Sequence, residues 1–418
     1  MTTFVKHTDL IGSSIPWLKN FRDKGEEAFE KTGIPLPKTE AWKYTKPVRF
    51  FDEDFNYNPH GFANFDKTPL PALPFEAYRI VFENGILQNI DETLPQEVTA
   101  LPLIEALMLQ TEAPVRLGKT FDMMKHPFAA LNTAYLNEGL YLEIPQGFVL
   151  DKPLVLIYHV SAEDGRAMYN LRNFIHADEA SQAHIIEYFC YDGAVKSCYF
   201  TNIVNEILIE PSAYLTHDKV QTEAFKAAHI ALNSVKIFGN GSYKSFCLQT
   251  GADMARNETK VVLAEEGAST QVDAAYMMHG WATLDTTTDI EHLVPNTTSN
   301  QLVKGVVGGQ AKGVFQGKIH IAPCAVKTQG YQLHKALLLS DEAEIDVKPE
   351  LEIFADDVKC SHGAACGQLD EEQLFYMQSR GISREAAKQL LVDAYLDEVI
   401  AKVDNEKIKE WIKSFLMI

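Results

Sequence analysis

The stretch ADDVKCSHGAACGQLDEE, residues 355 to 372, places a thiol and an imidazole two positions apart, at Cys360 and His362. On an extended strand both side chains would leave the same face. A thiolate and a neutral imidazole both suit iron, so a metal site is one interpretation. A nucleophile with its base is a second, but that chemistry needs the base aimed at the thiol and a third group to orient it. Packing at the end of a buried strand is the third, and the spacing does not decide between metal binding and packing.

Other residues that could carry catalysis have simpler explanations. In TTTDIEH, Asp289 and Glu291 lie on one strand face, as the two acids of a glycoside-cleaving enzyme would. Alternating acids are more often the solvated face of a strand, so we expect no catalysis there. His279 and His292 are isolated in a β-rich region, where hydrogen-bonded structural histidines outnumber metal ligands.

Two glycine-rich stretches could resemble phosphate-binding loops. They are GGQAKGVFQGKIH (308 to 320) and GNGSYKS (239 to 245). Neither is followed by a helix, and the first ends in Lys-Ile, with no hydroxyl for magnesium. We therefore predict glycine-rich corners, no nucleotide bound directly by this chain, and a protein that is not an enzyme.

Composition excludes several classes of partner. The chain has 418 residues, a formal net charge of −19 and 46% apolar residues. Nucleic acids and anionic membranes require clustered Lys and Arg, so neither is expected as a partner. No apolar run is long enough to span a bilayer, and the start of the sequence lacks the pattern of a secretory signal. Six scattered cysteines suggest reduced thiols and a cytoplasmic location.

The chain changes character twice. Residues 1 to 138 look mixed, with a helix expected over 16 to 33 and an irregular, proline-rich segment from 51 to 74. From about 139, short β-rich stretches such as KPLVLIYHV and TKVVLAE alternate with turns, and an acidic or proline-bearing turn followed by a small residue recurs every 18 to 33 residues. This repeat favours a solenoid, in which stacked corners leave little room for side chains, over an antiparallel sandwich.

Helices are expected again from Asp370. Asp370 can cap a first helix, with Gln373 placed to reach back, and Gly381 can end that helix. Ser383 can cap a second helix, and residues 405 to 418 form a third. A helical tail of this length is small for independent stability, so we expect it to pack on the solenoid or on a partner.

Several long motifs, in order, resemble the SufB/SufD family of SUF-type iron–sulfur cluster assembly. They are TEAWKYT, IEHLVPNTTSNQLVKGVV, AKGVFQGKIHIAPCAVKTQGYQLHKALLLSDEAEID and KPELEIFADDVKCSHGAACGQLDEEQLFYMQSRGIS. Chain length and the CSHG form favour the SufD branch. The resemblance implies a mainly β protein with a right-handed parallel β-helix core. The expected domains are an N-terminal mixed region (1–138), the β-helix (139–369) and a C-terminal helical segment (370–418).

The resemblance also implies a function: a non-enzymatic scaffold that pairs with SufB through β-helix edges and binds the ATPase SufC. In isolation the chain could form a homodimer. A transient iron–sulfur cluster would be shared with SufB, with His362 as the more important ligand and Cys360 in support. We expect SufC on the C-terminal segment, at an apolar cluster with an arginine nearby: Leu374, Phe375, Tyr376 and Arg380.

Two points stay open. Cys366 stands where the family commonly has another residue, so its role is undecided. The alternative function is a secreted-type β-helix enzyme that acts on polysaccharide, which would need carboxylates grouped in a cleft.

Overall fold

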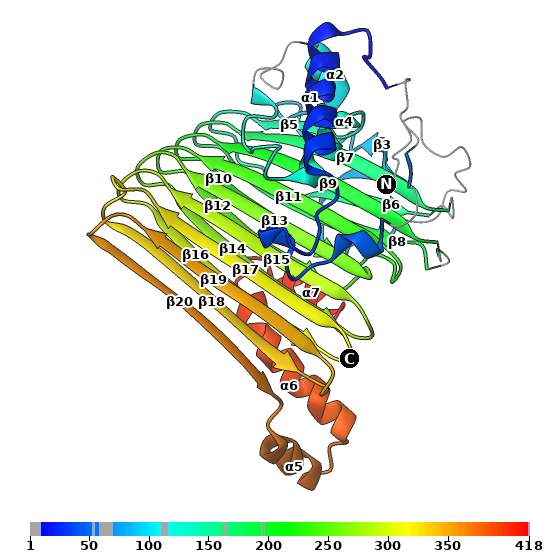
Figure 1. Cartoon of the computed structure of the whole chain (residues 1–418), viewed down its shortest axis with the longest axis vertical. Coiled ribbons are helices and arrows are strands. Elements are labelled where there is room, and N and C mark those ends of the chain that lie inside the picture. Colours follow the sequence, from blue (N-terminus) through cyan, green and yellow to red (C-terminus); the bar gives the residue numbers. More distant parts are fainter. Residues whose placement is uncertain are drawn as a thin grey trace.

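The main body of the protein is a parallel β-solenoid, in which the chain alternates between two ten-stranded sheets (Figure 1). The computed structural model describes residues 10–51, 55–57, 70–109, 116–161, 165–193, 195 and 197–416. The solenoid, the mixed N-terminal region and the C-terminal helices confirm the predicted fold class. The division into three domains at 138 and 369 remains a prediction.

We refer to the two sheets as sheet A and sheet B. In spatial order, sheet A contains β4 (Thr99–Pro102), β5 (Leu140–Ile144), β7 (Ala167–Ala177), β9 (Tyr199–Ile209), β11 (Ala228–Ile237), β13 (Met254–Leu263), β15 (Thr283–His292), β17 (Lys312–Ile321) and β19 (Glu344–Ile353), and the short β1 (Asn56–Tyr57) pairs with β7. Sheet B contains β3 (Ile86–Ile90), β2 (Tyr78–Glu83), β6 (Leu154–Val160), β8 (Gln182–Tyr191), β10 (Tyr214–Gln221), β12 (Ser242–Gln249), β14 (Ser269–Met278), β16 (Thr298–Val307), β18 (Thr328–Leu338) and β20 (Val358–Gln368).

Within each sheet, equivalent strands of successive coils pair in parallel and in register. Ala228 pairs with Met254 and Tyr141 with Phe174, so one coil takes 26 to 33 residues. Val, Ile, Leu and Phe from both sheets fill much of the interior between them. This arrangement excludes the antiparallel sandwich.

One corner of the solenoid shows why small residues recur there. A residue with positive φ occupies this corner in six successive coils: Ala180, Ser212, Asn240, Gly267, Asn296 and Lys327. The N–H group of each donates to a carbonyl of the following coil, as Asn240 does to Glu266 at 3.0 Å. The next residue is buried and small each time: Ser181, Ala213, Gly241, Ala268, Thr297 and Thr328. The predicted corner signature is therefore confirmed.

The glycine-rich stretches are corners only in part. Gly239, Gly308 and Gly309 lie in turns, as predicted, but Gly313 and Gly317 lie within β17, where the prediction was wrong. A Cβ atom at 317 would lie 1.8 Å from Nε2 of Gln332, and one at 313 would lie 2.6 Å from the Ile345 side chain. These glycines make room for inward-facing side chains of neighbouring strands.

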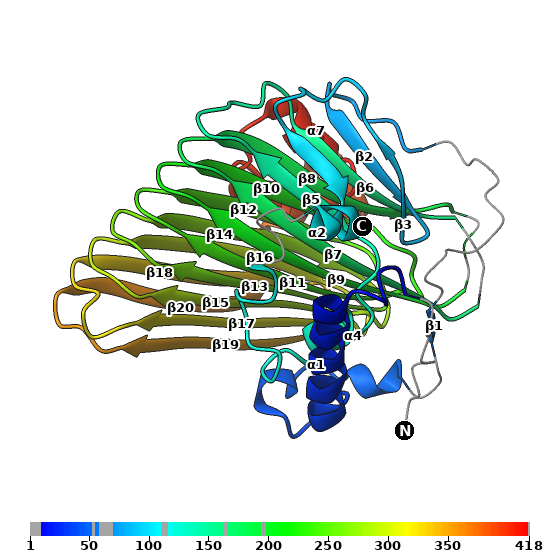
Figure 2. The same ribbon diagram turned by 90° about the horizontal axis from the view of Figure 1, so that it is seen from above.

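Antiparallel strands cap the N-terminal end of the solenoid. β3 pairs antiparallel with β2, and β4 pairs antiparallel with β5, while α2 (Leu103–Met108) follows β4 (Figure 2). Inside this end, Phe82 stacks on Tyr158, which stacks on Phe189, with ring centroids 4.9 and 4.5 Å apart. Phe82 is completely buried, so the chain itself completes the core here.

Helices from the N-terminal region lie on the outer face of sheet A (Figure 2). They are α1 (Pro16–Thr32) and α4 (Pro127–Ala134). Two short 3-10 turns, Glu40–Trp42 and Pro47–Arg49, follow α1 in the chain. The helix predicted over 16 to 33 is confirmed, and Gly33 ends it with φ of 62°. Leu18 and Ala28 are buried as expected, whereas Trp17 is 38% exposed. Most of the proline-rich segment lies outside the described residues.

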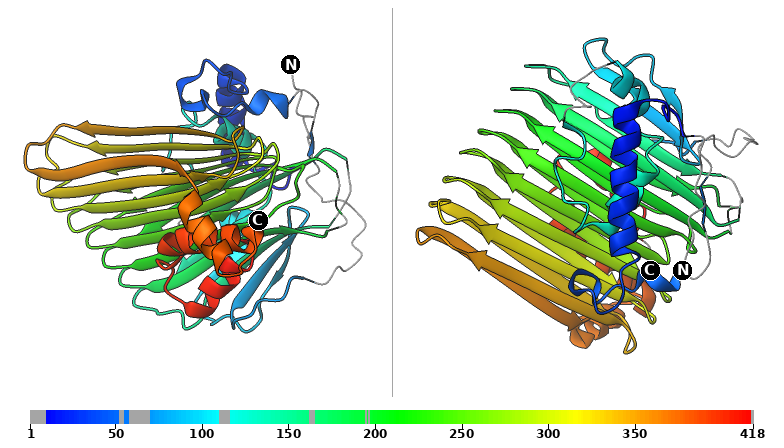
Figure 3. Two further views of the ribbon diagram at one scale, coloured as in Figure 1. Left: turned by 90° about the horizontal axis from the view of Figure 1, so that it is seen from below. Right: turned by 45° about the horizontal axis from the view of Figure 1, so that its top comes forward.

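The three C-terminal helices form as predicted: α5 (Glu371–Ser379), α6 (Arg384–Ile400) and α7 (Glu406–Lys413). The side chains of Asp370 and Ser383 accept backbone N–H groups at the starts of α5 and α6, and Gly381 follows α5 with φ of 85°. α6 and α7 pack on the outer face of sheet B, whereas α5 projects beyond the last coil (Figure 3). None of the helices described is long and apolar enough to cross a membrane.

Candidate functional site

The C-terminal end of the solenoid is open. β19 and β20 are the last strands of sheets A and B, and no further strand of the described chain pairs with their outer edges (Figure 1). Edge strands present unpaired backbone N–H and C=O groups, which readily pair with another chain. The coil that carries the predicted site therefore has an outer side that no strand of the described residues covers.

Cys360 and His362 both point toward the interior at this open end. They pair with Gly330 and Gln332 of β18, which are buried inward-facing positions. The prediction that they share one face of one strand is confirmed, because residues two apart on β20 project to the same side. His362 is exposed and forms no hydrogen bond or ion pair with the described part of the chain. Its imidazole is therefore available to an incoming ligand.

Cys360 is more enclosed than His362. It packs against a small apolar cluster that includes Ile319, Ile321 and Ala325. This partial burial raises the pKa of the Cys360 thiol, while a backbone hydrogen bond from Gly330 lowers it in part. The thiol therefore favours its protonated form until a metal or another positive charge stabilises the thiolate. The same environment is compatible with packing, so the geometry leaves both roles of Cys360 possible.

Cys366 lies on the same face of β20 but farther along the strand. It pairs with Ala336 and is exposed. Four residues of strand separate it from His362, which corresponds to about 13 Å. Cys366 is therefore too distant to join Cys360 and His362 on one small metal centre.

Across the interior from β20, β19 presents an apolar inner face. Its register with β17 places five residues inward: Ile345, Val347, Pro349, Leu351 and Ile353. The alternate residues are charged and face outward, as in the ion pair of Lys318 with Glu352 at 2.8 Å. The five inner residues are only partly buried or exposed. We call this face, together with the inner face of β20, the open-end surface.

The open-end surface offers two candidate metal ligands, Cys360 and His362, but no complete set. The described residues contain no group of three or more His, Cys, Asp and Glu side chains that could hold a metal ion. The donor types at Cys360 and His362 nevertheless fit iron, which accepts both sulfur and imidazole nitrogen. Further ligands would have to come from outside this chain.

A second exposed surface lies on α5. Phe375 and Tyr376 are 73% and 60% exposed, and the Arg380 guanidinium lies over the Tyr376 ring at 5.2 Å. Leu374, which the sequence placed in the same partner-binding cluster, is completely buried and cannot contact a partner directly. Arg384 binds Glu371 through two hydrogen bonds of 3.0 and 2.7 Å, which ties α6 to the start of α5. We call Phe375, Tyr376 and Arg380 the α5 surface.

The TEAWKYT motif fastens the N-terminal region to the outer face of sheet A. Arg256 of β13 donates to Asp285 of β15 at 2.7 Å and to the carbonyl of Ala41 at 2.9 Å, and its guanidinium lies 4.2 Å from the Trp42 ring. Thr45 also donates to Asp285. The motif therefore stabilises the solenoid wall, and it reaches the last coil, where Lys348 of β19 donates to Glu40 at 2.8 Å.

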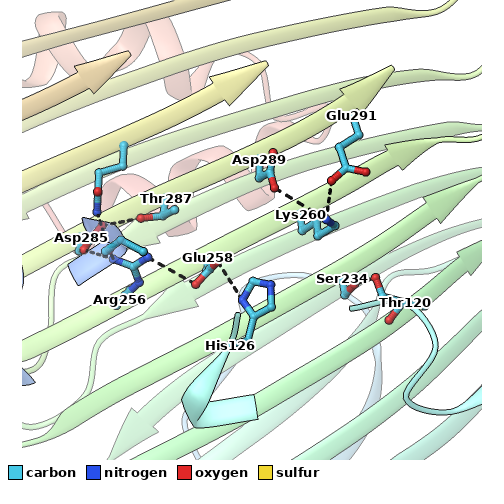
Figure 4. A network of polar contacts seen from close by, with 12 residues as sticks. Thr120, His126, Ser234, Arg256, Glu258, Lys260, Asp285, Thr287, Asp289 and Glu291 are labelled. Carbon is cyan, nitrogen blue, oxygen red and sulfur yellow. Dashed lines mark hydrogen bonds and ion pairs between the residues drawn. The ribbon is translucent and has the colours of Figure 1, made fainter. Parts of the chain in front are cut away.

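The same face holds the acids considered for catalysis (Figure 4). Lys260 lies 2.6 Å from Glu291 and 3.8 Å from Asp289, so both acids belong to an ion-pair ladder. Beside them, His126 and Arg256 flank Glu258. Burial would raise the pKa of Glu258, but His126 and Arg256 lower it to about 2. This network fits a structural role.

The two isolated histidines differ in environment. His292 is buried and hydrogen-bonded to Thr297 and Ser299 at 2.8 and 2.9 Å, as expected of a structural histidine. His279 is exposed at a corner. The sequence reasoning missed the apolar inner face of β19, although the strict alternation of charged and apolar residues in EIDVKPELEI carried that signal.

Comparisons with known proteins agree over most of the chain. A family model described as SUF system FeS cluster assembly, SufBD core domain, matches residues 159–395, and a model of the SufBD protein N-terminal region matches residues 1–156. An iron–sulfur cluster assembly SufBD family protein of Synechocystis is 31% identical over 92% of this chain and 87% of its own length. Iron–sulfur cluster assembly protein SufD of Escherichia coli is 29% identical over 91% and 88%, and a SufBD family protein of Staphylococcus aureus is 23% identical over 93% and 86%.

Proposed function

This chain belongs to the SufBD family of the SUF system of iron–sulfur cluster assembly, and we propose that it acts there as a non-enzymatic, SufD-type scaffold subunit. The family resemblance read from the sequence motifs is thereby confirmed. In the proposed role the chain pairs with a SufB-type subunit, binds the SufC ATPase and holds part of a transient iron–sulfur cluster, which is cargo of the complex.

The observation that carries this proposal is the open-end surface. Its strand edges are unpaired within the described chain, its β19 face is apolar, and its β20 face carries Cys360 and His362. An apolar surface next to free strand edges favours a protein that continues both sheets. A SufB-type β-helix docked there could supply the missing ligands, so that the cluster forms between the subunits. A second copy of this chain could cover the same surface when SufB is absent.

His362 is the more important of the two ligands in this proposal. It is exposed and has no partner among the described residues, whereas Cys360 is half-buried and its thiol has a raised pKa. A cluster bound by His362 and partner thiolates would leave Cys360 in a supporting role.

The proposed dock for SufC is the α5 surface. α5 projects from the solenoid, and two of its aromatic side chains are mostly exposed beside Arg380. Energy for assembly would enter through the ATPase, because this chain lacks a phosphate-binding loop motif. None of the six cysteines, all of which lie in the described residues, is in a disulfide bond, which supports the further proposal of a cytoplasmic, reducing location.

Point variants test the two docks separately. α6 and α7 cover apolar residues of sheet B such as Phe246 and Leu302, so deleting the whole tail would expose that face. The double variant Phe375→Ser, Tyr376→Ser should lose SufC but retain SufB when the three proteins are co-expressed. The double variant Val347→Asp, Leu351→Asp should lose SufB but retain SufC.

Tyr214→Ser provides the control, because Tyr214 is an exposed tyrosine on a strand of sheet B. Co-purification followed by intact mass spectrometry is the measurement. Full SufC binding by the α5 variant would place its dock elsewhere. Full SufB binding by the β19 variant would contradict pairing through the open end.

A further inference from the structure

Polar side chains form two facing columns inside the solenoid. The register of sheet A stacks five inward residues on successive strands, which we call the sheet A column: Asn173, Asn205, Asn233, Thr259 and Thr288. The register of sheet B stacks six, which we call the sheet B column: His217, Ser245, Val272, Gln301, Gln332 and His362. Apart from Val272 every member is polar, and the sheet B column ends at the exposed His362.

Near the capped end, many polar groups inside the solenoid bind one another, although Oε1 of the buried Gln221 has no partner among the described residues. Asn205 donates to Asn233 at 2.7 Å and to the carboxylate of Glu187 at 3.0 Å. Lys219 lies 3.5 Å from Glu187 and donates to Asn257 at 3.1 Å. This part of the interior is a network of charges and amides.

Toward the open end, several buried polar side-chain atoms lack a hydrogen-bond partner among the described residues. Thr286 donates to Gln249 and Thr288 donates to Gln301, but the Nε2 atoms of both glutamines have no partner among the described residues. Gln332 has a partner for neither its Oε1 nor its Nε2, although it is only 2% exposed. Buried polar groups in folded proteins are normally hydrogen-bonded, to protein or to ordered water.

The interior also has space beside these groups. Ser245 and Cys247 both face inward yet are only partly buried, which indicates a hollow next to them. The Nδ2 atom of Asn257, a 4% exposed residue of the facing sheet, is without a partner as well. Farther along, the Gln332 amide occupies the space left by the missing side chain at Gly317, so it lies in the interior against β17.

We propose that the interior of the solenoid binds a chain of water molecules, from the hollow beside Cys247, past Gln301 and Gln332, to His362. A buried water needs two to four polar partners, and the unpartnered amides supply donors and acceptors along this line. The chain of waters would connect His362 to the network around Lys219 in the interior. His362 would thus contact both this internal water and the solvent outside. The inference does not depend on the proposed function, because it concerns the isolated chain.

A high-resolution crystal structure of the wild-type chain tests the proposal without any substitution. We expect ordered water within hydrogen-bonding distance of both amide atoms of Gln332 and of Nε2 of Gln301. An interior in which those atoms contact only carbon would overturn the proposal.

A solution test uses Gln332→Met, which keeps the side-chain length and removes both polar atoms. Gln329→Met is the matched control, because Gln329 lies on the same strand but is exposed. Oxygen-17 magnetic relaxation dispersion counts long-lived internal waters. We expect at least one fewer in Gln332→Met than in the wild type, and no change in Gln329→Met. Equal counts in all three folded proteins would overturn the proposal.

Discussion

The two ends of the solenoid are built from the same kind of coil but are finished differently. At the N-terminal end, β3 and β4 turn antiparallel and α2 follows, so that interior residues such as Phe82 and Leu156 are completely buried. At the C-terminal end, no strand of the described residues follows β19 and β20 in their sheets. The inward residues Leu351 and His362 therefore remain accessible. The chain therefore completes its core at one end and leaves it incomplete at the other.

This difference is the basis for proposing that the chain associates with a partner through its open end. Apolar burial stabilises by about 25 cal/mol per Å² removed from water. At the capped end that gain is realised within the chain, whereas at the open end it is realised only when another surface covers β19 and β20. Stability and partner binding should therefore respond to opposite ends of the molecule.

The largest expected effect comes from matched leucine truncations at the two ends. Leu156→Ala removes a fully buried side chain of β6 that faces the interior of the solenoid. We expect a loss of about 2–5 kcal/mol in the free energy of unfolding. Leu351→Ala removes a partly buried side chain of the open end, and we expect a loss of about 1 kcal/mol. Urea unfolding of the isolated chain measures both. Equal losses would mean that the two ends are equally well packed.

A pair of glycine substitutions comes next. Gly317→Ala forces a methyl group to within 1.8 Å of the Gln332 amide and 2.7 Å of the Phe315 ring, so we expect a loss of about 1–3 kcal/mol. Gly367→Ala meets nothing within 4 Å on the open strand, so we expect a change of about 0.5 kcal/mol or less. The denaturant midpoints of the variants, compared at an unchanged dependence of the free energy on denaturant concentration, measure both effects. A Gly317→Ala variant as stable as the wild type would show that the interior can relax there.

The pH dependence of stability should reflect buried histidines of the interior. Burial lowers the pKa of His334 to about 4 from its ordinary 6.5. As pH falls from 6.5 toward 4, His334 binds a proton in the unfolded chain but not in the folded chain. The free energy of unfolding that is present above pH 6.5 therefore decreases. The loss is about 2 kcal/mol at pH 5. His292, with its pKa also lowered to about 4, acts in the same direction.

His334→Gln should therefore reduce the loss of stability between pH 7 and pH 5 by about 2 kcal/mol. Asp273, whose pKa burial raises to about 6, acts in the opposite direction in all variants, so the informative quantity is the difference from wild type. Gln329→Met, which changes an exposed and uncharged side chain, is the control and should keep the wild-type slope. An unchanged slope for His334→Gln would show that this histidine is protonated in the folded chain.

Much of the fold follows from local sequence patterns. Small residues at the corners, caps such as Asp370 and Ser383, and Gly381 after α5 all report local geometry, which neighbouring residues determine. The shared face of Cys360 and His362 follows from the period of two residues in a strand.

What the sequence did not reveal depends on contacts across the fold. The burial of Leu374 depends on how α5 meets the rest of the chain, and the role of Gly317 depends on a glutamine in another strand. The TEAWKYT motif was recognisable, but its attachment to Arg256 and Asp285 joins residues more than 200 positions apart. Local periodicity carries no information about such pairs.

The smallest expected effect on stability belongs to the residue with the largest proposed functional role. His362→Ala should change the free energy of unfolding by about 0.5 kcal/mol or less, because the imidazole is exposed and unpartnered among the described residues. Thermal unfolding of the isolated chain checks this, and a large loss would indicate a structural role for His362.

The central claim is that the open end holds part of an iron–sulfur cluster through His362. Its most direct test measures the iron and acid-labile sulfide content of the complex that this chain forms with SufB and SufC, purified from cells. The His362→Ala complex is compared with the wild type and with His279→Ala, which changes another exposed histidine. We expect an assembled complex whose cluster content falls about tenfold or more, since changes to partners of metal ligands already cost 10–100-fold in affinity. The His279→Ala complex should match the wild type. Wild-type cluster content in an intact His362→Ala complex would contradict the claim.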